Sequence, residues 1–167
     1  MKDNLTKSDI AKMEAEIEHR KLVLRPELIK HVQVAREQGD LSENFEYYAA
    51  KKEKNQNESR IRYLERMIRT ANVIDDSSND DEVGINNLVT IEYIDDDETE
   101  EIKIVTTVRA DSFKNLISID SPLGKAVLHH KLGEVVKVHV NDDVNYEVKI
   151  VNIVKNTDDS EDQLKKY

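Results

Sequence analysis

The amino-acid sequence predicts an α+β protein, with an N-terminal antiparallel helical hairpin (coiled coil) followed by a C-terminal domain of a small antiparallel β-sheet and one helix. Two changes near residues 76–82 support this division. The spacing of apolar residues changes from three and four, typical of helices, to two, typical of strands. The charge changes as well, because residues 1–75 hold 15 Lys and Arg against 14 Asp and Glu, whereas residues 76–167 hold 10 against 21. We expect a hairpin over 1–75, a linker over 76–84, a β domain over 85–155 and a disordered tail over 156–167.

The first helix is predicted to run from Ser8 to the glycine at position 39. Its seam keeps spacings of three, four and seven residues, as in a coiled coil, and comprises Ile10, Met13, Ile17, Leu24, Leu28, His31 and Ala35. Pro26 lies inside this pattern and predicts a kink or short break near Arg25, because proline cannot donate a helical hydrogen bond. Gly39 then ends the helix.

The second helix is predicted to begin at Asp40 or Ser42, where a serine cap is followed by acidic residues that favour a helix N-terminus. Its seam comprises Tyr47, Ala50, Lys54, Asn57, Ile61, Leu64, Ile68 and Ala71. Folding the two helices about 39–42 brings Ile17 opposite Leu64, as an antiparallel hairpin requires. Polar seam residues such as Asn57 weaken the apolar contact midway, and single polar residues at such positions can define the register of a coiled coil.

The second half alternates with a period of two and predicts strands separated by turns. The expected strands are 88–94, 101–108, 116–119, 135–140 and 146–154. Between them, Ser121 and Pro122 begin a short helix, with serine at the cap and proline at the first position. A small antiparallel sheet carrying one helix is the fold that this order predicts.

The composition excludes several classes of protein. With no cysteine, the chain has neither a disulfide framework nor a thiolate nucleophile. A net charge of −10 argues against a free-standing binder of duplex DNA, because the phosphates would repel most of the surface. The five histidines have no catalytic or metal-binding spacing, and no apolar stretch approaches the length of a membrane span. We expect a soluble cytoplasmic protein with no membrane partner.

Asp40 and Glu43 stand three residues apart in the predicted turn of the hairpin. The local sequence alone favours a structural role, in which both carboxylates stabilise the N-terminus of the second helix. The alternative is a metal site, since carboxylate oxygens suit Mg²⁺. Two carboxylates are too few to hold Mg²⁺ tightly, so a partner would have to supply the remaining ligands.

A run of basic residues follows on the second helix, and Lys51, Lys52 and Lys54 lie nearest the turn. The simpler interpretation is a solvated helix face with ion pairs between residues four apart, such as Glu58 with Arg62 and Glu65 with Arg69. The alternative is a surface that guides a phosphate backbone. Tyr47 could stack on a base there, although its seam position favours packing against the first helix.

Several motifs in this order resemble the bacterial Gre transcript-cleavage factors, and GreA more than GreB. The matching segments are Arg25-Pro26-Glu27, Ala35-Arg36-Glu37-Gln38-Gly39-Asp40-Leu41-Ser42-Glu43-Asn44, Ala71-Asn72-Val73-Ile74-Asp75 and Ser121-Pro122-Leu123-Gly124-Lys125-Ala126. The resemblance spans nearly the whole chain, from about residue 6 to residue 154.

The resemblance implies a C-terminal domain similar in fold to FK506-binding proteins, which would grip RNA polymerase at the rim of its secondary channel. The hairpin would enter that channel, where Asp40 and Glu43 would help to hold a weakly bound Mg²⁺ and to orient the water that attacks the RNA. The chain would then be no enzyme on its own. It would have no cofactor apart from the Mg²⁺ shared with the polymerase, and no small-molecule substrate.

The same resemblance suggests further contacts. Lys51, Lys52, Lys54 and Tyr47 would face the nascent RNA 3′ end. The residues that match the polymerase-binding segment of the family are Ser121, Pro122, Leu123, Gly124 and Lys125. Capping and packing of the short helix is an equally good interpretation of these five residues.

The sequence departs from the family pattern at the turn and midway along the hairpin. Phe45 stands where alanine is usual, and Asn55-Gln56-Asn57 replaces a stretch like glutamine-glycine-phenylalanine. These departures motivate an alternative function, a non-cleaving Gre-like paralogue that occupies the channel and inhibits or regulates the polymerase. A third possibility is a coiled-coil chaperone or prolyl isomerase that uses Phe113 with Tyr93 or Tyr146 as pocket aromatics.

Overall fold

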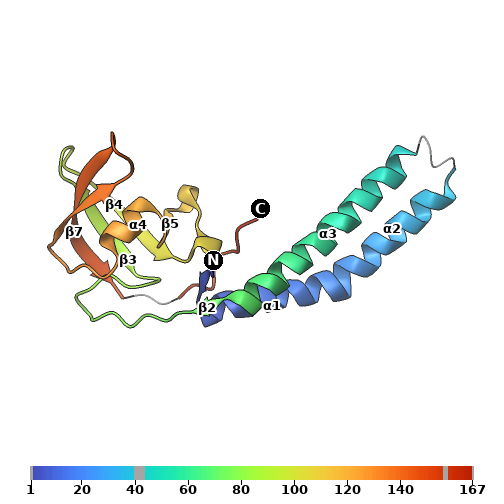
Figure 1. Cartoon of the computed structure of the whole chain (residues 1–167), viewed down its shortest axis with the longest axis horizontal. Helices are drawn as coiled ribbons and strands as arrows, with labels where there is room; N and C mark the ends of the chain where they lie inside the picture. The colour runs from blue at the N-terminus through green and yellow to red at the C-terminus, as the bar shows by residue number, and fades with distance from the viewer. Residues whose placement is uncertain (1, 40–43, 156–157, 167) are drawn as a thin grey trace. The chain divides into compact units, whose positions relative to one another are not determined.

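The computed structural model describes residues 2–39, 44–155 and 158–166, and it divides into two compact units (Figure 1). The first unit comprises Met1–Asp3 and Asp9–Asn72, and the second comprises Asn4–Ser8 and Val73–Tyr167. The N-terminal residues of the second unit include the short strand β1 (Asn4–Leu5), which pairs with β2 (Asn72–Val73). The predicted α+β class is confirmed, with helices in the first unit and a curled sheet in the second.

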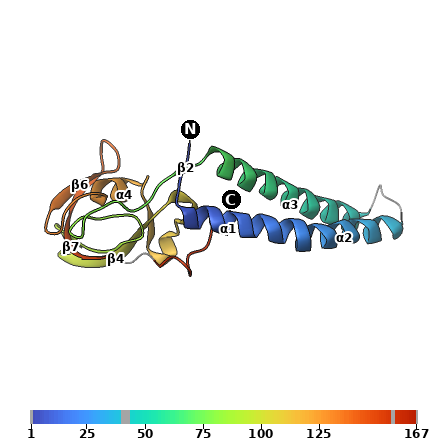
Figure 2. The same cartoon turned by 90° about the horizontal axis from the view of Figure 1, so that it is seen from below.

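The first unit is the predicted helical hairpin. Its first arm consists of α1 (Lys7–His19), the π-helical turn η1 (Arg20–Leu24) and α2 (Arg25–Glu37). Its second arm is α3 (Phe45–Thr70), a single helix of 26 residues. Figure 2 shows α3 lying alongside the first arm.

The irregularity that Pro26 predicts is the π-helical turn that precedes it. The N–H of Arg25 donates to the carbonyl of Arg20, five residues earlier. Pro26 has no N–H, so it cannot continue the usual bond to the fourth preceding residue. A π turn absorbs this loss without breaking the arm, and α2 begins directly at Arg25.

Apolar contacts between the arms follow the predicted seam at most positions. The buried apolar residues of the hairpin are Met13, Leu28, Val32, Ala35, Ile61, Leu64 and Met67. The prediction for His31 is wrong, because this residue is exposed and Val32 is buried in its place. Val32 lies four residues after Leu28 and three before Ala35, so it meets the same periodicity, and burial of an apolar side chain is the favourable choice.

The second unit is built on a five-stranded sheet in the order β5-β4-β3-β7-β6. Its strands are β3 (Leu88–Tyr93), β4 (Glu98–Val105), β5 (Leu116–Ser118), β6 (Val135–His139) and β7 (Asn145–Val154). All neighbouring pairs are antiparallel except β4 and β5, which are parallel, so the sheet departs from the predicted antiparallel arrangement at this edge.

The parallel pairing of β5 follows from the segment that connects it to β4. The 3₁₀ turns η2 (Thr107–Arg109) and η3 (Ser112–Lys114) occupy this connection, including positions expected to continue the strand. Asn115 adopts a left-handed conformation with φ of 56° and directs the chain into β5. The helix α4 (Pro122–Val127) follows and packs on the sheet, where Val127 joins the buried core.

The acidic stretch expected to be a linker belongs to the second unit. Lys155 Nζ donates to Ser78 Oγ at 2.6 Å and to the Glu82 carbonyl at 2.7 Å. Val83 is fully buried in the core of the sheet. A lysine at the end of the last strand thus holds this stretch against the unit.

Residues 158–166, which belong to the predicted tail, contact the second unit. Asp162 Oδ2 accepts hydrogen bonds from Lys103 Nζ and Arg109 Nη1, each at 2.9 Å. The side chain of Arg109 is completely buried, and a buried cation requires a nearby carboxylate. The tail supplies that carboxylate, a role that its charged composition could not indicate.

Candidate functional site

Asn44 joins the two arms of the hairpin beside the predicted carboxylate site. Its Oδ1 accepts a hydrogen bond from the Tyr47 N–H at 3.0 Å and thereby caps α3. Its Nδ2 donates to the carbonyl of Ala35, near the end of α2, at 2.6 Å. The predicted helix start at Asp40 or Ser42 is therefore wrong, because Asn44 is the N-cap and α3 begins at Phe45.

Asp40 and Glu43 themselves lie outside the described residues. They belong to the segment of chain between Gly39, which follows α2, and Asn44, which precedes α3. Because Asn44 fills the N-cap position, neither carboxylate is needed for that role.

Aromatic side chains stand at the start of α3. Phe45 is 84% exposed, an unusual environment for a ring of this size. Tyr47 is half-buried, and the guanidinium of Arg36 lies 5.6 Å from its ring centroid. A hydrogen bond to Arg36 lowers the pKa of the Tyr47 hydroxyl. The ring centroid of Tyr48 lies 5.5 Å from that of Tyr47, so these rings pack against each other at the end of the hairpin.

The basic residues predicted to face RNA lie along the first turns of α3. Lys51 and Lys52 are exposed, and Lys54 is half-buried. The expected ion pairs within α3 are not those that the structure contains. Glu58 instead accepts two hydrogen bonds from Arg25, at 2.7 and 2.8 Å, and Glu65 pairs with Lys21 at 2.6 Å. Both acids of the second arm thus bind the first arm and tie the hairpin together.

A polar cluster lies midway along the hairpin beside the π turn. Asn57, only 4% exposed, receives a hydrogen bond from Arg20 Nη1 at 2.9 Å and donates one to the Arg20 carbonyl at 3.3 Å. Glu16 accepts hydrogen bonds from Arg20 Nε and Arg60 Nε, each at 2.8 Å. Burial alone would raise the pKa of Glu16, but the hydrogen bonds and charges of Arg60 and Arg20 outweigh it and lower the pKa.

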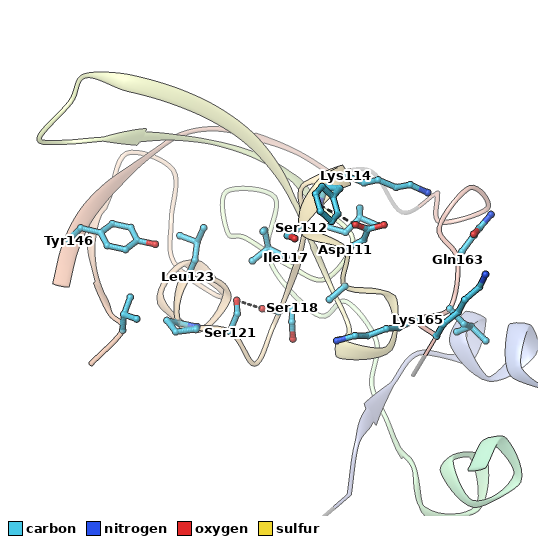
Figure 3. A pocket seen from close by; sticks show the side chains of 17 residues that line it. Asp111, Ser112, Lys114, Ile117, Ser118, Ser121, Leu123, Tyr146, Gln163 and Lys165 are labelled. Carbon is cyan, nitrogen blue, oxygen red and sulfur yellow. Dashed lines mark hydrogen bonds between the residues drawn. The ribbon is translucent and has the colours of Figure 1, made fainter. Parts of the chain in front are cut away.

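The second unit contains a groove beside α4, with a volume of about 850 Å³ (Figure 3). Of the five residues predicted to bind polymerase, Ser121, Pro122 and Leu123 line it. Ser121 Oγ accepts from the Gly124 N–H at 3.0 Å and donates to the Ser118 carbonyl at 2.7 Å, so the same residue caps α4. The structural and the binding interpretations of this segment are therefore compatible.

Gly124 and Lys125, the other two predicted residues, do not line the groove. Gly124 is buried, and a Cβ atom at this position would lie 1.9 Å from the Ser118 carbonyl oxygen. The glycine allows α4 to approach β5 closely. Lys125 is exposed on α4.

Further residues that line the groove come from distant parts of the chain. Figure 3 shows Tyr146 and Leu123 at one end, Ile117 in the middle and Lys165 at the other end. Phe113, on the turn before β5, is 99% exposed at the groove. Phe113 and Tyr146 were expected only as pocket aromatics, and no motif predicted a place at the groove for the tail residues Gln163–Lys166. Leu164, an isolated apolar residue in a charged tail, was the available signal.

No metal site is evident in the part of the chain that the structure describes, where no group of three or more His, Asp or Glu is placed to hold an ion. Asp40 and Glu43 supply hard oxygen donors of the type that Mg²⁺ prefers, but only two of them. Among the described helices, none is both long and apolar enough to cross a membrane.

These features define a class of two-unit α+β protein, in which one unit is a helical hairpin and the other is a β-sheet unit with an apolar groove. Two family models match the chain in sequence. The transcription elongation factor N-terminal model (GreA and GreB) matches residues 4–73, and the GreA/GreB C-terminal model matches residues 77–155. The chain belongs to the GreA/GreB family of transcription elongation factors.

Two relatives in sequence agree with this assignment. The transcription elongation factor GreA of Staphylococcus saprophyticus is 41% identical over 89% of this chain and 94% of its own length. GreA of Mesoplasma florum is 43% identical over 89% of this chain and 96% of its own length. Among solved structures, GreA factor homolog 1 (Gfh1) of Thermus thermophilus is 26% identical, with a TM-score of 0.42 over 92% of this chain and 99% of that protein.

Proposed function

We propose that this elongation factor inserts its hairpin into the secondary channel of bacterial RNA polymerase and stimulates the polymerase's own cleavage of backtracked RNA. The observation that supports this most strongly is the construction of the hairpin end. Asn44 links the carbonyl of Ala35 to the first turn of α3, so the two helix ends that flank Asp40 and Glu43 in the sequence are joined to each other. A helix of 26 residues, at 1.5 Å per residue, gives an arm of about 39 Å.

To support cleavage, the hairpin must keep its end in a fixed position inside the polymerase channel. The bidentate pair between Arg25 and Glu58 and the pair between Lys21 and Glu65 connect the two arms at successive levels. Charged pairs with this geometry limit sliding of one helix along the other. The two arms of the hairpin can therefore enter the channel together as one rigid unit.

At the polymerase active site, Asp40 and Glu43 would hold and orient the attacking water and accept its proton. When bound there, Mg²⁺ would stabilise the attacking and leaving oxygens of the phosphodiester. The two carboxylates fit this ion in donor type, and their small number is the reason that the polymerase must complete the site. Lys51, Lys52 and Lys54 would attract the phosphates of the nascent RNA 3′ end.

Stalled elongation complexes with purified bacterial polymerase test the proposal directly. Addition of the wild-type chain should shorten the transcript, and the chain alone should leave free RNA intact. Asp40→Asn with Glu43→Gln should slow cleavage about a hundredfold, within the usual effect of losing an acid–base group, and should leave polymerase binding nearly unchanged. Asp95→Asn with Asp96→Asn is a matched control, because these exposed residues lie in the turn between β3 and β4.

A second function is favoured by the exposure of Phe45. A ring that is 84% exposed next to the carboxylate segment could contact the channel wall and hold the hairpin there without promoting cleavage. The chain would then slow nucleotide addition while the transcript kept its length. The same stalled complexes distinguish the two functions, since only the first produces shortened RNA. Full cleavage by the double carboxylate variant would exclude the role of Asp40 and Glu43 in the first function.

A further inference from the structure

The groove beside α4 differs in charge from the unit that contains it. Residues 76–167 hold 10 Lys and Arg against 21 Asp and Glu. The charged residues that line the groove are nevertheless Lys114, Lys165 and Lys166 with a single acid, Asp111. Asp111 Oδ1 accepts the Phe113 N–H at 3.0 Å and is engaged in the turn. The groove is thus a locally basic site on an acidic unit.

Two of those three lysines come from the C-terminal tail. The family model for this unit ends at residue 155, so the tail is an addition to the matched domain. Gln163, Leu164, Lys165 and Lys166 together form one wall of the groove. Figure 3 shows Gln163 and Lys165 on this wall, apart from Leu123 and Tyr146.

The tail is attached firmly enough to act as a wall. Asp162 binds both Lys103 and Arg109, and all three side chains are at least nine-tenths buried. The Lys103 ammonium also donates to the carbonyl of Asp158 at 2.8 Å. Beyond these pairs, the Lys165 N–H donates to the Val108 carbonyl at 2.6 Å. Fixed ion pairs therefore stand immediately before the groove-lining residues, and a backbone hydrogen bond holds them in place.

The apolar residues of the groove indicate that its binding partner also has an apolar face. Ile117, Leu123 and Val140 line it together with Tyr146, and Phe113 projects beside it almost fully exposed. An exposed aromatic residue next to an apolar groove is typical of protein-binding surfaces. An apolar groove with a basic rim suits a segment that has one apolar face and acidic flanks.

We infer that the tail residues 163–166 complete the polymerase-docking groove and select an acidic amphipathic segment of RNA polymerase as its occupant. This inference rests on the proposed function, because it takes polymerase as the partner. It goes further by assigning a role to a segment outside the matched family domain and by naming the chemistry of the polymerase surface that it binds. Lys165 and Lys166 pair with the acids, while Leu164 adds to the apolar contact.

The experiment measures binding of the full chain and of two variants to bacterial core RNA polymerase at low and high salt. Lys165→Glu with Lys166→Glu keeps the Asp162 anchor and should weaken binding about tenfold at low salt, with a smaller difference at high salt. Truncation after Asp162 also keeps the anchor and should weaken binding by a similar factor. Lys137→Glu with Lys149→Glu introduces the same change of charge at exposed sites on β6 and β7, and it should bind like the wild type.

The outcomes separate this inference from the proposed function. If the wild-type chain binds polymerase and both tail variants bind equally well, the tail has no part in docking and the inference is wrong. Tighter binding after truncation would also overturn it, since the tail would then obstruct the groove. If the wild-type chain cleaves no stalled transcript but still binds in a tail-dependent manner, the proposed function fails and the docking inference stands. A wild-type chain that does not bind polymerase overturns both.

Discussion

Asn57 and Arg20 hold each other across the hairpin, at the point where the first arm becomes π-helical. The Asn57 amide donates to the Arg20 carbonyl at 3.3 Å, and Arg20 Nη1 returns a hydrogen bond to Asn57 Oδ1 at 2.9 Å. The Arg20 carbonyl also accepts the N–H of Arg25 in the π turn. A polar residue on the second arm thus supports the backbone irregularity that Pro26 imposes on the first.

Asn57→Ala should destabilise the protein by about 1–3 kcal/mol, because it removes both hydrogen bonds that the buried Asn57 amide makes with the first arm. Denaturant unfolding followed by circular dichroism at 222 nm measures this loss. Asn55→Ala is the control, since Asn55 is exposed on the same helix and should cost no more than about 0.5 kcal/mol. Equal stabilities of the two variants would mean that the contact between Asn57 and Arg20 contributes nothing.

Glu16 should make the hairpin sensitive to acid. Its pKa in the folded state lies below the ordinary value of 4.5, so its contribution is present at neutral pH and is lost as the pH falls through the folded pKa. Glu16→Gln should lower the free energy of unfolding at pH 7, and the difference from the wild type should shrink toward pH 3. Unfolding curves at both pH values check this, and a difference that is independent of pH would contradict it.

Asp162→Asn should loosen the tail and destabilise the second unit. The variant leaves Lys103 and the buried Arg109 with less negative charge beside them, and breaking a buried ion pair typically costs about 3–5 kcal/mol. Thermal unfolding measures the effect, with Glu161→Gln as the exposed neighbouring control. If residues 158–166 instead move freely in solution, hydrogen exchange of the Lys165 amide will be fast in the wild type and Asp162→Asn will unfold like it.

The helical hairpin and the β-rich second unit could be predicted because their periodicities are local properties of the sequence. The parallel edge strand β5 could not be predicted, since its pairing with β4 depends on the two 3₁₀ turns and on the left-handed Asn115 that follows them. His31 and Val32 both fit the helical spacing between Leu28 and Ala35, so the periodicity alone could not distinguish them. Val32 is the buried one because its side chain is apolar.

The residues of the candidate sites also fall into those that the sequence could predict and those that it could not. The groove segment from Ser121 to Leu123 could be identified from its motif, and the structure places it on the groove. The contribution of tail residues 163–166 to the groove could not be predicted. It depends on the ion pair between Arg109 and Asp162, which lie 53 residues apart and which resemble ordinary surface charges in the sequence. Likewise, the ion pair between Arg25 and Glu58 joins two arms, whereas the sequence suggested partners within one helix.

Phe113→Ser should separate binding from folding. The ring is 99% exposed, so its removal should change the free energy of unfolding by less than about 0.5 kcal/mol. If the groove binds polymerase, the same change should weaken the affinity about tenfold or more, as expected for an aromatic anchor. Surface plasmon resonance with core polymerase measures the affinity. Unchanged binding would remove Phe113 from the docking surface.

Phe45→Ala distinguishes a cleavage factor from an inhibitor that occupies the channel. The ring contributes little to the fold, because it is largely exposed and Asn44 rather than Phe45 caps α3. A cleavage factor should therefore keep its rate of transcript shortening within about threefold, or about 0.6 kcal/mol in activation free energy. A channel inhibitor that depends on the ring should instead release the polymerase, and nucleotide addition should return to its rate without the factor. Parallel measurements of cleavage and elongation with the wild type and the variant decide between them, and recovery of elongation without any cleavage in either protein would favour the inhibitor.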